Sequence, residues 1–494
     1  MREKILVLWL LLSTLGLSAQ GYFEYTATAK TAYRQIIDLR FEEAKLLIQE
    51  VKKETPDNLV VHHLENYIDF LTVYIDEDRA AFARAEVRKN RRLKEIEAGD
   101  KNSPYRLYLQ ADMRMQWAIA RIKFAAIEEW FGIFKDINKA YKLLKRNEEQ
   151  FPDFIPNKKD LGIIHAMVSA VPSGIEWFSS LEGDLKKGKR ELQEVISYAS
   201  KNDFLFEQET YILYAYVLLQ FGNDEKGAWR IINQSNLKPN ESPTAAFILA
   251  NVAMKSGHND EAIKILERRA KGAKFHPFPY LDYMLGLAKL HRLDGDADKP
   301  MKQYLQQFKG RDYIKQTNRL LAWHELVNNH PAGYQQYMKK VQTQGSTFIG
   351  PDESAMEEAQ NGIPPNKDIL KARLLFDGGY FKRAYNMLIL QSNKEFEHPK
   401  SELEYHYFLA RSMHALKRYD EALQQYNFVV AKGRDASWYY ACRAALESGK
   451  IYEAKKDKKR ARVAYQLCLD IKPKEHRYDL HQKAKTQLKK LGNG

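Results

Sequence analysis

Two histidines in the segment WHELVNNH, residues 323–330, are the residue type that binds zinc. A zinc-protease motif places two histidines four residues apart, on one face of a helix. His324 and His330 are six residues apart, which separates them by about 240° around a helix of 3.6 residues per turn. One zinc ion cannot bridge them from a regular helix, so we predict no metal site.

Other catalytic patterns are absent from the sequence. It contains no Gly-x-Ser-x-Gly turn, no phosphate-binding glycine loop and no dinucleotide-binding glycine motif. Isolated serines and acidic pairs on helical surfaces carry no catalytic signal. We therefore expect a protein that is not an enzyme and that needs no cofactor.

The elements that carry these residues are expected to be helices. The 494 residues include only 25 Gly and 16 Pro, and they contain 59 aromatic side chains, so a large core of long helices is favoured over a turn-rich β-fold. The net charge of +14, from 78 basic and 64 acidic residues, is spread along the chain. A nucleic-acid interface would require a clustered basic patch, so we predict no nucleic-acid partner.

The N-terminal segment 1–20 has the pattern of a secretory signal peptide. Arg2 and Lys4 precede an unbroken apolar run from Ile5 to Leu12, and small residues follow it. The apolar run is too short to span a bilayer. No cysteine lies directly after the apolar run, where a lipoprotein would carry one, which argues against a lipoprotein. We expect an exported, periplasmic protein.

Short turn-and-helix phrases recur along the chain, such as LRFEEAKLLIQEVKKETP at 39–56 and LKRYDEALQQYNFVV at 416–430. Each phrase contains one key alanine, and some of these alanines are spaced 34, 38 and 39 residues apart. A small residue lies twelve positions before five of them. The key alanines are Ala44, Ala140, Ala228, Ala262, Ala384, Ala422 and Ala461, and the preceding small residues are Ala32, Ala250, Ala372, Ala410 and Gly449.

This pattern resembles the tetratricopeptide repeat (TPR), a helix–turn–helix unit of 34 residues. The whole chain looks like a secreted TPR protein of the Gram-negative bacterial type. The resemblance implies an all-α fold, a right-handed α-solenoid of TPR-like helical hairpins.

The same patterns suggest a domain organisation. After the signal peptide we expect an N-terminal helical block at 21–152, a Gly/Pro-interrupted helical insertion at 153–200, a central helical block at 201–344, a linker at 345–367 and a C-terminal TPR array at 368–494. The segment 479–491 is expected to be a capping helix with a polar face.

The two cysteines are expected to meet across the last hairpin. Facing residues of a helical hairpin have numbers with a constant sum, and Cys442 with Cys468 has the same sum as Gly449 with Ala461. In an oxidising compartment the pair could form a disulfide. The alternative is two small buried thiols in the core, and the sequence leaves both open.

The resemblance also implies a partner-binding face, because TPR arrays usually bind extended peptides along their first helices. One such position falls eleven residues before each key alanine, and in the last three repeats it holds Arg373, Arg411 and Lys450. Neighbouring positions hold Phe376, Tyr407, His414 and Arg443. We interpret these residues as a basic surface that binds a protein or peptide, including acidic segments. The competing interpretation is a solvated helix face.

The expected function is that of a non-enzymatic, exported scaffold or adaptor that binds protein segments on its concave face. The alternative is a binding protein at the cell envelope for a non-peptide ligand, a glycan or a lipid. Trp177 and Phe178 in the 153–200 insertion are the local signal for that alternative. Peripheral association with the envelope is compatible with both.

Overall fold

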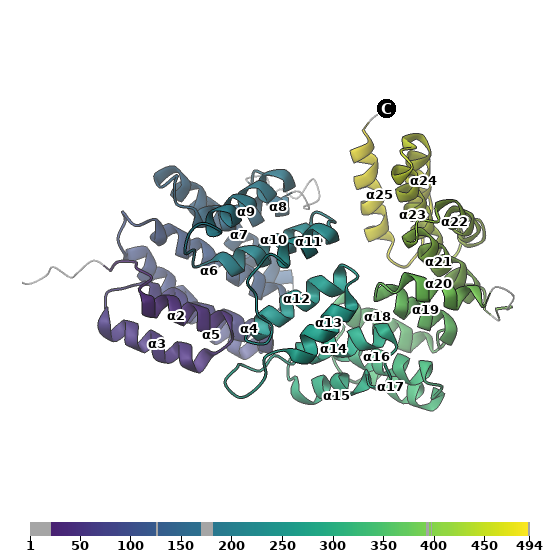
Figure 1. Cartoon of the computed structure of the whole chain (residues 1–494), viewed down its shortest axis with the longest axis horizontal. Coiled ribbons are helices and arrows are strands. Elements are labelled where there is room, and N and C mark those ends of the chain that lie inside the picture. The colour runs from purple at the N-terminus through teal and green to yellow at the C-terminus, as the bar shows by residue number, and fades with distance from the viewer. Residues whose placement is uncertain (1–20, 125–126, 169–180, 392–394, 397, 493–494) are drawn as a thin grey trace, which may run out of the picture. The chain divides into compact units, whose positions relative to one another are not determined.

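The computed structural model describes residues 21–124, 127–168, 181–391, 395–396 and 398–492. Within these ranges the chain forms twenty-four helices and no strand, and one isolated backbone bridge joins Tyr22 to Asn58. Figure 1 shows these helices in chain order. The predicted all-α fold built from TPR-like helical hairpins is confirmed.

The chain divides into two compact units. Within the described residues, unit 1 comprises the chain up to Ser256 together with Glu261–Met284 and Gln306–Arg311, and unit 2 comprises Gly257–Asp260, Leu285–Leu305 and the chain from Asp312 onward. Three helices contribute residues to both units. These are α13 (Asn259–Arg268), α14 (Tyr280–Arg292) and α15 (Asp298–Gln307).

Unit 1 contains five consecutive helical hairpins and one further helix that packs on the last of them. The hairpins are α2 (Ala27–Ile37) with α3 (Phe41–Glu54), α4 (Val60–Asp76) with α5 (Arg79–Ala98), α6 (Pro104–Ile122) with α7 (Ile127–Gln150), α8 (Pro156–Val168) with α9 (Leu185–Ala199), and α10 (Glu207–Gln220) with α11 (Glu225–Ile232); the further helix is α12 (Pro243–Lys255).

Unit 2 contains four hairpins of the same kind and two single helices. The hairpins are α16 (Ile314–Val327) with α17 (Pro331–Thr343), α19 (Lys367–Asp377) with α20 (Phe381–Ile389), α21 (Pro399–Ala415) with α22 (Tyr419–Gly433), and α23 (Tyr440–Ala454) with α24 (Lys458–Asp470); the single helices are α18 (Gly350–Asn361) and α25 (Arg477–Leu491). Helix α25 packs on α23 and α24, where a capping helix was expected.

Local sequence signals explain where many helices begin. The side chains of Asp78, Asp184 and Asp224 each accept a hydrogen bond from a backbone N–H of the first turn that follows. Such caps satisfy donors that have no partner inside the helix. Pro104 and Pro399 occupy first-turn positions, where a missing N–H costs nothing.

The small residues of the repeat pattern lie where paired helices approach most closely. All seven key alanines are fully buried, as are Ala32, Ala250, Ala372 and Ala410. A Cβ atom added to Gly449 would collide with the ring of Tyr465 on the partner helix. The spacing of small residues in the sequence therefore identified the contact line of these hairpins correctly.

Two of the expected segments contain helices that pack on their neighbours. The residues expected as an insertion include the packed hairpin of α8 and α9, in which glycine takes the place of alanine: a Cβ added to Gly188 would lie 2.7 Å from the backbone N of Ala166 and would collide with the carbonyl of Gly162. The expected linker contains α18, which packs on α16 and α17. Its Pro351 occupies the first turn, and Pro364 follows the end of the helix at Gly362.

No helix among the described residues combines the length and apolar character that a membrane span requires. The expected signal peptide at 1–20 lies outside the described residues, and so do Trp177 and Phe178.

Candidate functional site

The first helices of the three C-terminal hairpins, α19, α21 and α23, pack in sequence along unit 2. Each of them carries a basic residue directly after its small packing residue: Arg373 follows Ala372, Arg411 follows Ala410 and Lys450 follows Gly449. Successive helical residues are about 100° apart. The small residue therefore packs against the second helix while the basic residue points to the neighbouring first helices.

Arg411 lies over aromatic side chains on this face. Its guanidinium carbon is 4.0 Å from the ring centroid of Phe376 on α19, and it is 5.7 Å and 5.6 Å from the centroids of Tyr407 and Phe408. Stacking on a ring holds a guanidinium in one plane and leaves its edge donors available. The nearest carboxylate is that of Asp377, whose Oδ1 is 3.9 Å from Nη1 of Arg411.

Arg373 shares the same carboxylate and has a ring of its own. Its Nε atom is 3.8 Å from Oδ2 of Asp377, and its guanidinium carbon is 5.0 Å from the ring centroid of Trp323 on α16. Both ion-pair distances to Asp377 are longer than a normal hydrogen bond. Asp377 therefore balances part of the charge of two arginines without saturating the donors of either.

The structure adds two residues that the sequence analysis did not select. Trp323 donates from Nε1 to Oε1 of Glu358 at 2.8 Å, and Arg319 lies 4.8 Å from the centroid of the Trp323 ring. Arg319 and Arg373 thus both contact this indole. The sequence signal for this contact is Trp323 itself, which begins the segment interpreted above only as a candidate zinc motif.

The other end of the face is organised by Glu447 on α23. Its carboxylate accepts a 2.8 Å hydrogen bond from Lys450 and lies 3.9 Å from Nδ1 of His414. Burial alone raises the pKa of Glu447, but Lys450, Arg411 and Arg443 together outweigh burial and hold that pKa below its ordinary value. Burial lowers the pKa of His414, which favours the neutral imidazole at neutral pH.

The predicted partner-binding residues therefore lie near one another on α19, α21 and α23, with one correction. Tyr407 was expected at the surface, but its side chain is fully buried and packs against Tyr426 and Tyr440. The side chains of Arg373, Arg411 and Lys450 are 33%, 22% and 42% exposed. We call the residues Arg373, Arg411, Arg443 and Lys450 the basic row.

The basic row has the chemistry of a carboxylate-binding surface. It carries four positive charges, while the acidic residues that interact with it are Asp377, Glu404 and Glu447. Burial raises the pKa of Glu404, which weakens its negative contribution. A planar guanidinium can donate two parallel hydrogen bonds to a carboxylate, so an incoming acidic side chain would find preformed donors here.

The two cysteines lie at the end of the same unit, across the hairpin of α23 and α24. Both side chains are fully buried free thiols, and their Sγ atoms are 3.5 Å apart. The hydrogen bond between them lowers the pKa of Cys442 and raises that of Cys468. The structure thus shows the reduced pair, in a position where oxidation would join two adjacent helices.

The histidines of the segment 323–330 have separate partners. Nε2 of His324 is 3.1 Å from the backbone carbonyl of Gly295, and Nδ1 of His330 is 3.2 Å from a carboxylate oxygen of Glu325. Among the described residues no group of three or more His, Cys, Asp or Glu side chains is arranged to hold a metal ion.

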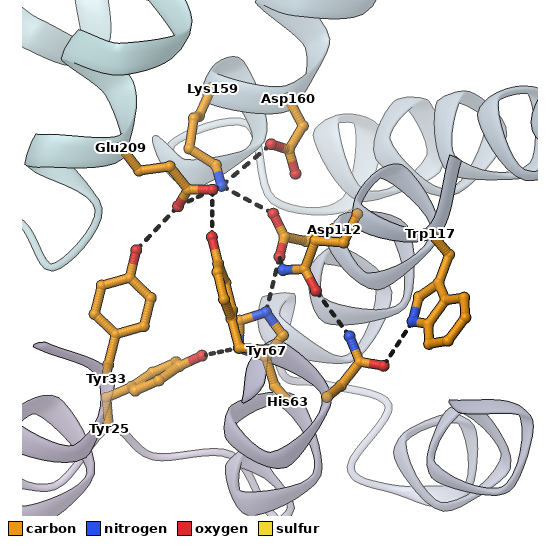
Figure 2. A network of polar contacts seen from close by, with 11 residues as sticks. Tyr25, Tyr33, His63, Tyr67, Asp112, Trp117, Lys159, Asp160 and Glu209 are labelled. Carbon is orange, nitrogen blue, oxygen red and sulfur yellow. Dashed lines mark hydrogen bonds and ion pairs between the residues drawn. The ribbon is translucent and has the colours of Figure 1, made fainter. Parts of the chain in front are cut away.

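Unit 1 contains a second polar cluster, which is buried (Figure 2). The ammonium of Lys159 on α8 lies 2.9 Å from Asp112, 3.2 Å from Asp160 and 3.1 Å from Glu209. These residues come from α6, α8 and α10, which are first helices of successive hairpins. The cluster therefore connects three hairpins through one fully buried cation.

Tyrosines and a histidine complete the hydrogen bonds of the Lys159 cluster. Glu209 accepts from the hydroxyls of Tyr33 at 3.0 Å and Tyr67 at 2.6 Å. His63 lies 2.8 Å from Asp112 through Nε2 and 2.8 Å from the hydroxyl of Tyr25 through Nδ1, as Figure 2 shows.

The carboxylates of the Lys159 cluster differ in their affinity for protons. Burial raises the pKa of Asp112, but Lys159 and His63 outweigh burial and bring that pKa below its ordinary value. Burial raises the pKa of Asp160 well above its ordinary value despite the contact with Lys159. Asp160 therefore keeps its proton to a higher pH than Asp112 does. Lys159 is fully buried and contacts carboxylates from three hairpins. The Lys159 cluster therefore fits a stabilising role between hairpins.

Comparison with known proteins finds no family profile that matches the chain and no curated protein that matches it. Solved structures do overlap with it along most of its length. The TPR domain of P58(IPK) is 13% identical, covering 87% of this chain and 99% of that chain, with a TM-score of 0.21. Cut9–Hcn1 of the APC/C is 12% identical with a TM-score of 0.24, and yeast Tom70 is 11% identical with a TM-score of 0.22; each match covers 94% of this chain and 96% of that chain. Similarity at this level shows nothing about the function of this chain.

Proposed function

We propose that this chain is a non-enzymatic scaffold that binds acidic protein segments along the first helices of its C-terminal hairpins. The observation that supports this most directly is the geometry of Arg411, whose guanidinium is stacked on Phe376 and only loosely paired with Asp377. Partners with spaced carboxylates would bridge from Arg411 to Arg373 and Lys450. The interaction would then be charge-assisted and sensitive to salt.

The repetition of the helices supports an extended partner. The basic row draws one or two residues from each of α19, α21 and α23. Packed helices are spaced about 8–10 Å apart, which an extended peptide covers in about three residues. A segment with acidic residues at about every third position would therefore match the row.

Export is a further part of the proposal. The pattern of segment 1–20 supports a signal peptide that is removed near Ala19, which would place the mature chain in the periplasm and bring it close to the cell envelope. Cell fractionation with N-terminal sequencing tests this part. Recovery in the periplasmic fraction with a new N-terminus near Gln20 is expected, and an uncleaved cytoplasmic chain would contradict it.

Site-directed photocrosslinking tests the binding face in the cell. A photoreactive amino acid replaces His414, which lies beside the basic row on α21. As a control it replaces Lys459, which is exposed on the second helix α24. Crosslinks from position 414 to a defined acidic segment of one or a few proteins are expected, with few from position 459. Equal crosslinking from the two positions would contradict a specific first-helix surface.

A matched pair of charge variants provides the second arm. Arg373→Glu with Arg411→Glu reverses the charge of two of the four residues of the basic row, whereas Lys458→Glu with Lys459→Glu makes the same change in net charge at exposed positions of α24. We expect the first double variant to lose at least about tenfold in affinity while the second keeps its crosslinks. Wild-type affinity and crosslinks in both double variants would refute the proposed site.

A further inference from the structure

A small cavity of about 290 Å³ lies in unit 1, separate from the basic row. Its lining comes from the residues before α2, the start of α6, the end of α9 and the connections that lead into α8 and α10. Six aromatic side chains line it. They are Tyr25, Tyr105, Phe154, Tyr198, Phe204 and Phe206.

The six rings form one continuous series of contacts. From Phe154 the series passes to Tyr105 at 5.0 Å between centroids and then to Tyr25 at 5.5 Å. It continues through Phe206 at 5.9 Å, Phe204 at 5.8 Å and Tyr198 at 5.8 Å. Because neighbouring rings support one another, the wall exists without a ligand.

The inner part of this wall is fixed by the Lys159 cluster. The hydroxyl of Tyr25 is bound to His63, and the ammonium of Lys159 lies 5.1 Å from the centroid of the Phe206 ring. Figure 2 shows Tyr25 directed to His63. The exposed part is Tyr198, whose side chain is 40% exposed. The cavity is therefore rigid at its base and open at Tyr198.

The charged residues of the cavity are Lys30, Asp153 and Asp203. The ammonium of Lys30 is 3.0 Å from the carboxylate of Asp203, and Arg34 lies 3.4 Å from the same carboxylate. Among the described residues, Asp153 takes part in no ion pair. Asp153 is thus the carboxylate of the cavity that pairs with neither Lys30 nor Arg34. Ring faces and a carboxylate are both negative, so together they attract a cation.

We propose that this cavity binds the trimethylammonium group of a small organic cation, with Asp153 as its counter-ion. The volume suits a headgroup rather than a large ligand. Quaternary ammonium groups cannot donate hydrogen bonds, so they need only ring faces and a nearby negative charge, which this site provides. A neutral sugar would stack on the rings and leave the charge of Asp153 without a partner.

The test compares choline with 3,3-dimethyl-1-butanol, a neutral molecule of the same shape, by calorimetry on the full chain. Choline is expected to bind at least about tenfold more tightly, because the charge is the only difference. Equal affinity for both molecules, binding of neither, or binding of a neutral sugar in place of choline would overturn the proposal.

Variants at exposed positions locate the site. Tyr198→Ala and Asp153→Asn are each expected to weaken choline binding about fivefold or more. Their controls are Tyr216→Ala and Asp57→Asn, which alter exposed residues of unit 1 outside the cavity. Unchanged affinity in Tyr198→Ala and Asp153→Asn would overturn the assignment to this cavity.

Vesicles distinguish the two sources of the ligand. Binding of free choline together with cosedimentation on phosphatidylcholine vesicles, and not on phosphatidylglycerol vesicles, would identify a lipid headgroup. Binding of free choline without cosedimentation would identify a soluble cation. Both results support the cation site, whereas cosedimentation that persists in Asp153→Asn would contradict it.

Discussion

The guanidinium of Arg411 on α21 stacks on the ring of Phe376 on α19, with 4.0 Å between its carbon and the ring centroid. This contact joins two successive hairpins and fixes the orientation of the central arginine of the basic row. Arg411 is 22% exposed and pairs loosely with Asp377 at 3.9 Å. The arginine is therefore positioned by apolar contact and remains able to bind an acidic partner.

Replacing the ring tests this positioning. Phe376→Leu keeps an apolar side chain but removes the cation–π contact, so the affinity for an acidic peptide should fall about three- to tenfold. Fluorescence anisotropy with a labelled acidic peptide measures the effect. The control is Phe428→Leu, a half-buried phenylalanine on the second helix α22. Equal losses in both variants would show that Phe376 has no special relation to Arg411.

Neutralising Asp377 should strengthen binding. Its carboxylate partly balances Arg373 and Arg411, so Asp377→Asn should raise the affinity for an acidic peptide about two- to fivefold at low salt. Asp420→Asn, at an exposed position of α22, is the control. Lower affinity in Asp377→Asn would indicate that the carboxylate organises the arginines rather than competing with the ligand.

Removing the buried cation of unit 1 should destabilise that unit. Lys159→Met leaves the buried Asp112 and the partly buried Glu209 without their cation, a loss that costs about 3–5 kcal/mol. Hydrogen exchange of α6 and α8 should accelerate accordingly. Lys158→Met is the control, because Lys158 is partly exposed and pairs with Glu194 at the surface, where such a pair contributes about 0–1 kcal/mol. Similar exchange in both variants would contradict the stabilising role of the cluster.

The raised pKa of Asp160 predicts a pH effect of known sign. Burial raises the pKa of Asp160 in the folded state, whereas the unfolded chain releases this proton near pH 4. Above that pH the unfolded state binds fewer protons, so this residue makes the protein less stable as the pH rises toward its folded-state pKa. The Asp160→Asn variant cannot ionise at this position. Its free energy of unfolding should therefore exceed that of the wild type by an amount that grows from pH 4 toward neutrality.

Thermal unfolding measured at several pH values tests the Asp160 prediction. Asp57→Asn, at an exposed position, should show no such trend. A difference in stability between Asp160→Asn and the wild type that stays constant with pH would contradict a raised pKa of Asp160.

The cysteine pair predicts a redox-dependent stability of unit 2. Oxidation of Cys442 and Cys468 would close a loop of about 25 residues and stabilise the fold by roughly 3 kcal/mol in the chain-entropy model. Mass spectrometry of the alkylated chain, before and after a thiol oxidant, measures the bond, and thermal unfolding measures its effect. The oxidised chain should melt at a higher temperature, and Cys442→Ser should not respond to the oxidant. Oxidation without a rise in melting temperature would contradict this expectation.

The sequence predicted the hairpins because their contact line depends on residue size at a fixed spacing. Ala410, Ala422 and Ala461 are fully buried at the positions that the repeat pattern requires. The pattern failed for the hairpin of α8 and α9 because glycine replaces alanine there, and glycine also signals a break in a helix. Helix α18 was missed because its Pro351 looks like a helix breaker, although proline fits the first turn.

The candidate surface was only partly predictable for a similar reason. A register places residues on a helix face, and it located Arg373 and Arg411 correctly on the first helices. It cannot say how deeply a large side chain is covered by its neighbours, so Tyr407 was expected at the surface although Tyr426 and Tyr440 cover it. The Lys159 cluster joins residues from separate hairpins, and no local spacing reveals such contacts.

The most direct test of the central claim is the affinity of the purified chain for a short fluorescent peptide with glutamate at every third position, compared with its glutamine counterpart. The account predicts that the glutamate peptide binds at least about tenfold more tightly, that added salt weakens it, and that Arg411→Lys loses most of the difference because lysine cannot form the planar fork. Equal affinity for the two peptides, or wild-type affinity in Arg411→Lys, would contradict the proposal that the basic row is a binding site for acidic segments.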